Sequence, residues 1–364
     1  MWRLAAIALI VMTAPAWAAD WYCDASWGGT ESGTEAEPYN TIGEAIAAAS
    51  NLDTIYAKGG TDYAEAVTFS NLSIAIIGYT TTITDGGQAV IDATGETTGI
   101  AANCTTGNTP DMAIELQNLR VENATADGVL CNRTTDTAHA VVRNCVFVDN
   151  GDDGFEANHS SFNVTAYGCA FVSNGDYGAT GVTRAYRCFS GDNADAGFIM
   201  FGIGVYVDCV VVRNAEGFDL RTAGTVVAGC VADNNSSMGF SLVGGSISDC
   251  IATNNGGYGY VMVTSAVGLD CVAGAGGLAN TSGATSLASG AVYYDGTTVS
   301  TDPYVSIYNT DAWSVWDYSI INTSGLYMRA APVGAGQMDS YDSPGPNDGV
   351  APGGGGTTII IVED

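Results

Sequence analysis

Three aspartates in the middle of the chain have a spacing that suits acid–base chemistry. Asp127 precedes one glycine, and the pair Asp152 and Asp153 precedes another glycine 26 residues later. Hydrolysis of a glycosidic bond with inversion uses two carboxyl groups roughly 6.5–9.5 Å apart, one protonated as the acid and one ionised as the base. If the fold places the two segments side by side, these aspartates are catalytic candidates. His159 follows the pair, and we include it as a fourth candidate on the same face.

Four carboxylates recur at a fixed offset and are candidates for metal binding. Each lies seven residues after a cysteine of a regular series, namely Asp152, Asp176, Asp195 and Glu216. On successive coils of a stacked fold, such groups would lie about 4.8 Å apart. Two oxygens at that separation can share a Ca²⁺ ion, whose ligands lie at roughly 2.3–2.6 Å. The series therefore predicts a Ca²⁺ site or, alternatively, a solvated acidic turn in an acidic protein.

The cysteine series reveals the repeat that would position these groups. A mean interval of 21 residues separates Cys145, Cys169, Cys188, Cys209, Cys230, Cys250 and Cys271. An asparagine lies five residues after each of the first six cysteines, and a glycine, usually followed by an aromatic residue, lies eight or nine residues after them. Short β-branched runs at this period predict an all-β fold. We expect a single right-handed parallel β-helix of about 21 residues per coil with an N-terminal capping helix.

Stacking gives each column of the repeat a structural role. The cysteines and aromatic residues are expected to face inward as apolar stacks. Stacked cysteines point the same way, so their Cβ atoms lie beyond the usual disulfide range of roughly 3.5–4.5 Å, and we expect buried thiols. The asparagines are expected at a turn, where they tolerate a left-handed backbone and hydrogen-bond to the amide of the next coil.

The two ends of the chain have compositions of their own. Arg3, the apolar run from Leu4 to Met12 and the small-residue pattern ending at Ala18 predict a secretory signal peptide, and hence a secreted, extracellular or cell-surface protein. Thr41 and Glu44 form a capping box before an apolar helical stripe. The expected organisation is a signal peptide at 1–18, an N-terminal strand and capping helix at 19–60, β-helix coils at 61–280, C-terminal coils and cap at 281–339, and a Gly-rich flexible tail at 340–364.

The net charge restricts the partners. The formal charge is −29, from 39 acidic and 10 basic side chains. Nucleic-acid binding needs a basic stripe that this chain does not have, so we expect no nucleic-acid partner. After the signal peptide no stretch is long and apolar enough to predict membrane insertion. A polyanionic glycan would be repelled unless a divalent cation bridged the two, while the acidic surface also favours solubility.

Two segments resemble motifs of the pectin-lyase-like β-helix proteins. Residues 21–67 are similar to the N-terminal motif of that superfamily, and residues 302–336 are similar to its C-terminal motif. The matching pieces are Pro38-Tyr39-Asn40-Thr41-Ile42, Asp53-Thr54-Ile55-Tyr56, Tyr63-x-Glu65, Asp302-Pro303-Tyr304 and Ala331-Pro332-Val333-Gly334-Ala335-Gly336. The resemblance implies a right-handed parallel β-helix with a lateral groove for polysaccharide, and its lyases use calcium to hold acidic sugars.

The aspartates also resemble part of the polygalacturonase arrangement within this superfamily, in which one aspartate and then an aspartate pair flank the scissile bond. The chain departs from that pattern at residues 175–178, where Gly-Asp-Tyr-Gly replaces the family's Gly-His-Gly, and it has no counterpart of the family's Arg-x-Lys. Together these features predict an extracellular protein that binds or processes polysaccharide, as a lyase or a glycoside hydrolase. The alternative is a non-catalytic surface, adhesive or virion-associated structural β-helix.

Overall fold

The computed structural model describes residues 18–105, 112–133, 138–159 and 162–262, followed by four short strands up to residue 293. Most of the predicted signal peptide, Cys271, the C-terminal motif at 302–336 and the tail at 340–364 lie outside the described residues. Within the described ranges no helix is long and apolar enough to span a membrane.

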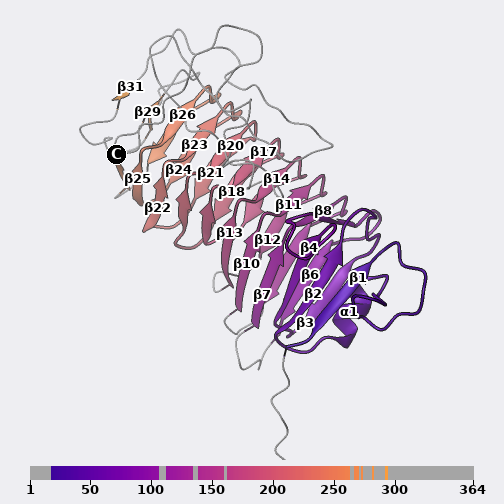
Figure 1. Ribbon diagram of the computed structural model, residues 1–364. Helices are drawn as coiled ribbons and strands as arrows, with labels where there is room; N and C mark the ends of the chain where they lie inside the picture. Colours follow the sequence, from indigo (N-terminus) through magenta and orange to yellow (C-terminus); the bar gives the residue numbers. More distant parts are fainter. Residues whose placement is uncertain are drawn as a thin grey trace, which may run out of the picture.

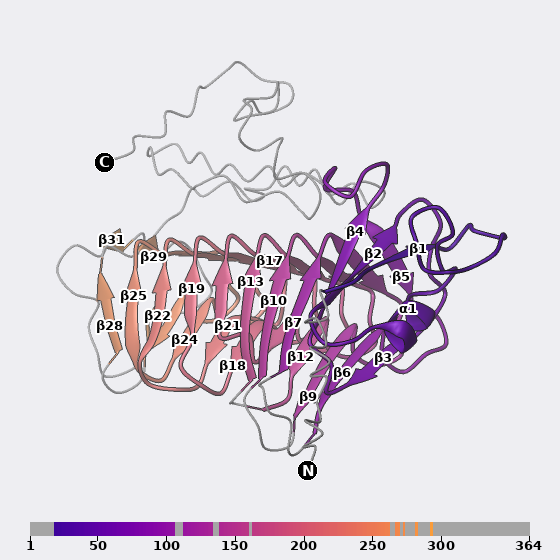
Figure 2. The ribbon, with the colours of Figure 1, turned by 60° about the horizontal axis from the view of Figure 1, so that its bottom comes forward.

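Nearly all described elements are strands of three parallel sheets (Figures 1 and 2). The first sheet contains β1 (Asp20–Asp24), β2 (Asp53–Lys58), β4 (Ile74–Tyr79), β7 (Met112–Gln117), β10 (Ala138–Arg143), β13 (Phe162–Tyr167), β16 (Arg184–Tyr186), β19 (Val205–Val207), β22 (Thr225–Ala228), β25 (Gly245–Ser248) and β28 (Ala266–Leu269). The second contains β5 (Ala89–Asp92), β8 (Leu119–Glu122), β11 (Val146–Val148), β14 (Ala170–Val172), β17 (Phe189–Gly191), β20 (Val210–Val212), β23 (Val231–Asp233), β26 (Ile251–Thr253), β29 (Val272–Ala273) and β31 (Val292–Tyr293). The third contains β3 (Val67–Ser70), β6 (Ile100–Cys104), β9 (Val129–Arg133), β12 (Phe155–Ala157), β15 (Ala179–Thr180), β18 (Ala196–Met200), β21 (Glu216–Leu220), β24 (Phe240–Leu242), β27 (Tyr260–Met262) and β30 (Thr281–Ser282).

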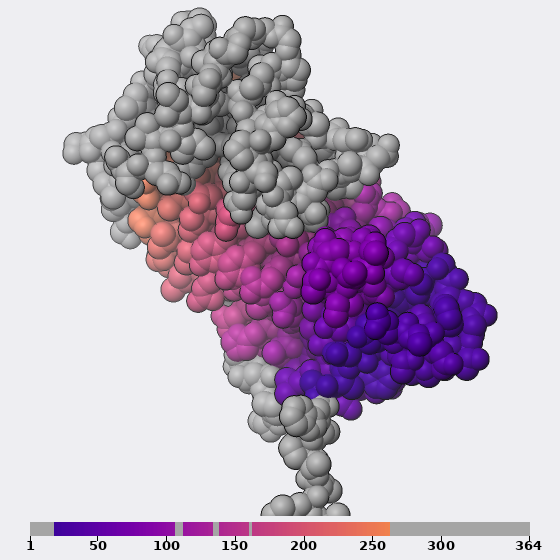
Figure 3. All heavy atoms as spheres, in the orientation of Figure 1, coloured from indigo at the N-terminus to yellow at the C-terminus, as the bar shows by residue number. Residues whose placement is uncertain are grey.

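Because the chain visits the three sheets in turn, each coil lies directly on the coil before it. The three parallel sheets confirm the all-β parallel β-helix fold that the repeat predicts. The described coils form one continuous body in the space-filling view (Figure 3). The residues that follow the cysteines pair in register, as Val146 with Ala170 and Phe189 with Val210. Inside the body, the rings of the Gly–aromatic column stack, with centroids 4.9 Å apart between Phe218 and Phe240.

The cysteine column is buried in this core. Cys145, Cys169, Cys188, Cys209, Cys230 and Cys250 are at most 1% exposed, and all are thiols. The backbone amide of Cys209 donates to Sγ of Cys230 at 3.4 Å, and the amide of Cys230 donates to Sγ of Cys250 at 3.3 Å. Burial also raises the pKa of Cys145 to about 12. The thiolate of Cys145, which is the form that reacts with alkylating reagents, is therefore strongly disfavoured in the folded chain.

We expect the folded protein to resist alkylation at these six cysteines, and unfolding without reductant to expose them together. Mass spectrometry after iodoacetamide treatment, with and without denaturant, measures this directly. Disulfides among these cysteines, or modification of the folded protein, would contradict the stacked register.

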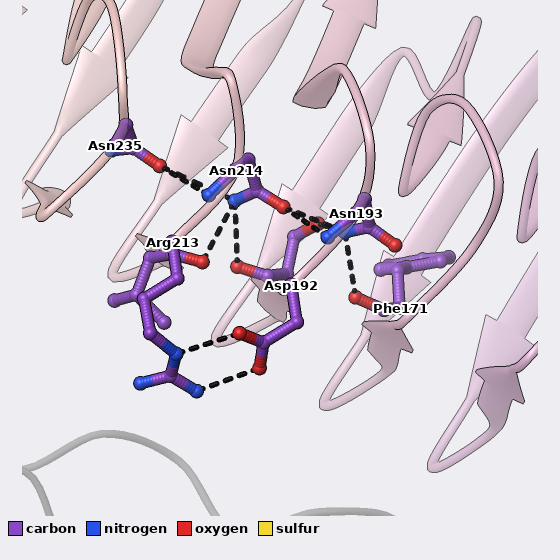
Figure 4. Close-up of polar contacts among 8 residues, drawn as sticks. Phe171, Asp192, Asn193, Arg213, Asn214 and Asn235 are labelled. Carbon is purple, nitrogen blue, oxygen red and sulfur yellow. Dashed lines mark hydrogen bonds and ion pairs between the residues drawn. The ribbon is translucent and has the colours of Figure 1, made fainter.

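The asparagine column forms a buried ladder along the coils (Figure 4). Oδ1 of Asn214 accepts from both the backbone amide and Nδ2 of Asn193, each at 2.9 Å, and Asn235 does the same for Asn214 at 3.1 and 3.4 Å. The prediction of a left-handed backbone at these asparagines is wrong. The positive φ lies one residue earlier, at positions such as Asp192 and Arg213, because the chain must turn before the asparagine side chain can point inward.

The N-terminal motif holds the first elements together. Helix α1 (Ile42–Ala48) begins after Thr41, whose side chain accepts from the amide of Glu44. The carboxylate of Glu65 accepts from the amides of Ile42 and Gly43 at 2.6 and 3.0 Å, at the positive end of the helix. In Figures 1 and 2, α1 lies at the N-terminal end of the coils.

Candidate functional site

The catalytic candidates lie where the chain enters the third sheet. Gly128 donates its amide to the carbonyl of Asp153, and Phe155 pairs with Val129, so Asp127 and Asp153 occupy equivalent positions on neighbouring coils. Arg120 pairs with Val146, which places Leu119 at the position that Cys145 occupies on the next coil. Three predicted catalytic residues, Asp127, Asp152 and Asp153, are therefore brought together.

His159 is not part of this group. It follows the C-terminal end of β12, whereas the aspartates precede the strand, so the whole strand separates them. Its Nδ1 atom lies 3.4 Å from Nη1 of Arg133, which is buried. The expectation that His159 shares the aspartates' site is therefore not met: it lies at the opposite edge of the sheet.

Asp153 is the most unusual of the three aspartates. It is 5% exposed, and its Oδ1 accepts from the amide of Tyr177 at 3.1 Å. Burial, reinforced by the nearby charges of Asp127 and Asp152, raises the pKa of Asp153 to about 7, although Thr180 and the Tyr177 amide oppose the increase. Near neutral pH this carboxyl group is therefore protonated in a substantial fraction of molecules.

Burial also raises the pKa values of two neighbouring carboxyl groups, Asp127 and Glu156. Asp127 accepts from the amide of Asp153 at 3.3 Å, and burial, followed by the charge of Asp152, raises its pKa. Burial, together with Asp127 and Asp152, also raises the pKa of Glu156 on the outward face of β12. Asp152 itself is exposed to solvent. The cluster thus combines one protonated carboxyl with an exposed carboxylate beside it, which is the pairing that acid–base chemistry needs.

The predicted metal ligands are only partly aligned. Asp152, Asp176 and Asp195 follow one another in a column, because each amide donates to the corresponding carbonyl of the coil before it. Glu216 keeps this alignment only in part: its amide also donates to the carbonyl of Asp195, at 3.3 Å, but its strand register is shifted by one residue. Only four residues separate Asn214 from Phe218, compared with five in the other coils of the ladder, so Glu216 pairs with Ala196 instead of Asp195.

One group of carboxylates has the geometry of a cation site. Ligand atoms of Asp152, Asp153 and Asp176 all lie within 4.8 Å of one another. Oxygens that ligate Ca²⁺ at 2.3–2.6 Å lie at most about 5 Å apart, so this set fits a Ca²⁺ ion in both chemistry and separation. Asp153 was not among the predicted metal ligands, because its position in the repeat is one residue further along.

Beyond the aspartates, a cavity of about 260 Å³ opens on the third sheet. Its lining includes Glu156 and His159 of one coil, Thr180 of the next, and Phe201 of the coil after that. Phe201 is 56% exposed, and the guanidinium of Arg221 lies 5.2 Å from its ring centre. Aromatic rings beside polar groups are suited to sugar rings, which have both apolar faces and hydroxyl edges.

Several residues near the aspartates and the cavity were not predicted from the sequence. Glu156, Thr180 and Asp219 each lie one position after the inward residue of the Gly–aromatic column, so strand alternation turns them outward. The alternation of inward and outward residues along these strands could have been predicted from the sequence. Asp219 is bonded to Arg221, with 2.6 Å between Nη2 and Oδ2, so this arginine's charge is neutralised locally.

Comparison with known proteins supports the fold. No family model matches the chain, and no curated protein matches it in sequence. Among solved structures, the pectate lyase Pel9A is 16% identical, with a TM-score of 0.55 over 82% of this chain and 86% of that one. The lacto-N-biosidase of Eubacterium ramulus is 11% identical, with a TM-score of 0.41 over 76% and 68% of the two chains. The pectin methylesterase of Aspergillus niger is 14% identical, with a TM-score of 0.35 over 80% and 93%. The chain thus has the right-handed parallel β-helix fold of the pectin-lyase-like proteins.

Proposed function

We propose that this protein is a secreted polysaccharide-processing β-helix. Its site would lie at the N-terminal ends of strands β9 and β12 in the third sheet. The observation that carries the proposal is the buried carboxyl of Asp153, whose pKa is raised to about 7, between the carboxylates of Asp127 and Asp152. A chain that only needed a rigid rod gains nothing from such a group, because burying a carboxylate opposes folding. The likeness in fold to a pectate lyase supports a carbohydrate substrate.

In the proposed reaction, protonated Asp153 donates its proton to the oxygen of the scissile glycosidic bond as that bond breaks. Carboxyl oxygens of Asp152 and Asp153 lie within 4.8 Å of one another, which is closer than the inverting geometry and suits the retaining one. The carboxylate of Asp152 therefore attacks the sugar carbon and forms a glycosyl ester as the leaving oxygen departs. Water, which gives its proton to the now ionised Asp153, then attacks the same carbon and releases Asp152. This division of roles requires one carboxyl group that holds a proton near neutral pH, and the burial of Asp153, which raises its pKa to about 7, provides it beside the solvent-exposed Asp152. The cavity lined by Thr180 and Phe201 would hold a neighbouring sugar ring.

A lyase-type function is the second candidate, and the geometry of Asp152, Asp153 and Asp176 favours it. Ca²⁺ bound there would bridge the acidic protein to a uronate and stabilise the negative charge of its carboxylate. These three aspartates would then hold the cation as carboxylates, with Asp195 next in the column. Such binding needs ionised Asp153, so the two candidate functions require opposite protonation states of one residue.

Incubation with neutral, pectic and alginate glycans, with Ca²⁺ or with a chelator, tests the proposal. Hydrolysis releases reducing ends without absorbance from an unsaturated uronate, and a lyase produces both in the presence of Ca²⁺. We expect hydrolysis that persists with the chelator. If the full panel gives neither product nor binding, the proposal fails and the structural β-helix is favoured.

The proposal extends to the two ends of the protein. Residues 1–18 would direct export and then be removed, which gives the site access to extracellular glycans. Helix α1 would cap the open end of a rod whose coils repeat about every 21 residues. Its buried residues Ile42 and Ala45 support this role, since an uncovered first coil would present unpaired strand edges.

A further inference from the structure

The cavity on the third sheet lies where one coil is shorter than its neighbours. Phe155, Ala179 and Phe198 occupy equivalent positions on three successive coils. From that position to the next cysteine, the coil of Ala179 takes nine residues, whereas the coils of Phe155 and Phe198 take fourteen and eleven. The short coil leaves the sheet first, turning at Gly181, where φ is 74°. A notch therefore opens between its two longer neighbours.

Side chains from all three coils line this notch. Thr180 ends the strand of the short coil, Glu156 and His159 belong to the coil before it, and Phe201 belongs to the coil after it. The cavity of about 260 Å³ is smaller than the roughly 300–1,000 Å³ typical of sites for drug-sized ligands. The notch thus suits a single sugar ring instead of a longer piece of a polysaccharide.

Thr180 offers the notch a hydroxyl group. Its side chain belongs to a residue that is 8% exposed, and its Oγ1 makes no hydrogen bond of normal geometry with the described residues. A buried hydroxyl in this state costs free energy, which a hydrogen bond to a ligand hydroxyl recovers. Thr180 is also close enough to Asp153 to oppose the rise in the pKa of that residue, so the notch adjoins the proposed catalytic acid.

Phe201 gives the notch an apolar wall. The residue is 56% exposed, so its ring has surface available to a ligand. The guanidinium of Arg221 lies 5.2 Å from the ring centre and is paired with Asp219, with 2.6 Å between Nη2 and Oδ2. The arginine therefore packs near the ring with its charge already balanced, and the ring is left to contact the apolar face of a sugar.

The charge around the notch distinguishes between kinds of sugar. The lining described above contains no lysine or arginine, and Glu156 forms no ion pair within the part of the chain that the structure describes. Burial, followed by the charges of Asp127 and Asp152, raises the pKa of Glu156, so negative charge from both aspartates reaches this wall. The carboxylate of a uronic acid would be repelled here, whereas an uncharged hydroxymethyl group would not.

We propose that the notch is a subsite for one neutral sugar residue and that it excludes uronic acids. The inference rests on the proposed function and names the class of glycan that would be processed. It predicts a substrate unlike the acidic polysaccharide that a Ca²⁺-dependent lyase would need.

Matched pairs of tetrasaccharides test this selectivity. Tetragalacturonide and tetramannuronide are each compared with the same chain after reduction of its carboxyl groups to hydroxymethyl groups, so each pair differs in charge but not in linkage. Binding to the full-length protein is measured by calorimetry with EDTA, which removes bridging cations, and at pH 8, where imidazole groups carry little charge. We expect a reduced chain to bind at least about 10-fold more tightly than its uronate form, and Glu156→Gln to lower this preference at least about three-fold.

Two further variants place the binding in the notch. Phe201→Ala removes the apolar wall, and we expect it to weaken binding of the preferred neutral chain at least about 10-fold. The matched control is Ile203→Ala, because Ile203 is 64% exposed and is not among the residues that line the cavity. We expect the affinity of this control to stay within about two-fold of the wild-type value.

Three results would overturn the proposal while leaving polysaccharide processing intact. One is equal or tighter binding of the uronate chains. Another is a preference for neutral chains that Glu156→Gln leaves unchanged, and the third is neutral binding that Phe201→Ala leaves unchanged, because the ligand would then lie elsewhere. If no chain of the set binds, the proposed subsite also fails, and the separate cleavage assay alone decides the proposed function.

Discussion

Replacing Asp153 by Asn is expected to lower the rate of polysaccharide cleavage by about 10²–10⁴-fold. Asparagine keeps an oxygen that can accept from the amide of Tyr177, as Oδ1 of Asp153 does at 3.1 Å, so the turn is retained. It has no acidic proton to donate, so the leaving oxygen would depart as an unprotonated alkoxide. The measurement is the release of reducing ends from the glycan that the wild-type protein cleaves.

The pH profile separates this role from a structural one. Asp153 acts as an acid only while protonated, so wild-type activity should fall as the pH rises through about 7, and this limb should be absent from the residual activity of Asp153→Asn. Asp249→Asn is the matched control, because Asp249 is exposed and lies on a turn far along the rod. If Asp153→Asn retained near-wild-type activity, Asp153 would not be the acid.

Replacing Asn214 by Leu is expected to destabilise the protein by about 3–5 kcal/mol, since each buried polar group left unpaired costs about 1–3 kcal/mol. Oδ1 of Asn214 is the acceptor for two donors of Asn193, and its Nδ2 donates to the carbonyl of Val212 at 3.0 Å. Asn214 is 3% exposed, so water cannot replace these bonds without opening the coils. Urea denaturation followed by circular dichroism measures the shift in midpoint.

Asn234→Gly is the control for the ladder. Asn234 is exposed and has a φ of 52°, a left-handed conformation that glycine adopts easily. The substitution therefore preserves the turn while changing an asparagine one residue away from the ladder member Asn235. We expect little change in its midpoint. A similarly small effect of Asn214→Leu would show that the ladder contributes little to stability.

The columns of the repeat could be predicted from the sequence because stacking makes equivalent positions chemically alike. Cysteines, asparagines and Gly–aromatic pairs at a regular period indicated the register, and the same register placed Asp127 beside Asp153. The place of Leu119 at a cysteine position could also be inferred, because Asp127-Gly128 follows Leu119 at the same distance as Asp153-Gly154 follows Cys145.

Other features of the site could not be predicted from the repeat period, because they depend on turn length, strand position and burial. A turn one residue shorter shifts the strand register of Glu216, which pairs with Ala196, although its distance from Cys209 is the same as in the other coils. His159 was grouped with the aspartates by sequence proximity, but an intervening strand carries it to the other edge of the sheet. The raised pKa of Asp153 depends on burial between coils, which no spacing could reveal.

Titration of Asp153 by carboxyl ¹³C NMR measures whether this group holds a proton near neutral pH, as the proposed reaction requires. The signal is assigned by its loss in Asp153→Asn. We expect a midpoint of about 7 in the folded protein without Ca²⁺. A midpoint near 4, the ordinary value for an aspartate, would contradict the proposed role, because Asp153 would then be an ionised carboxylate near neutral pH.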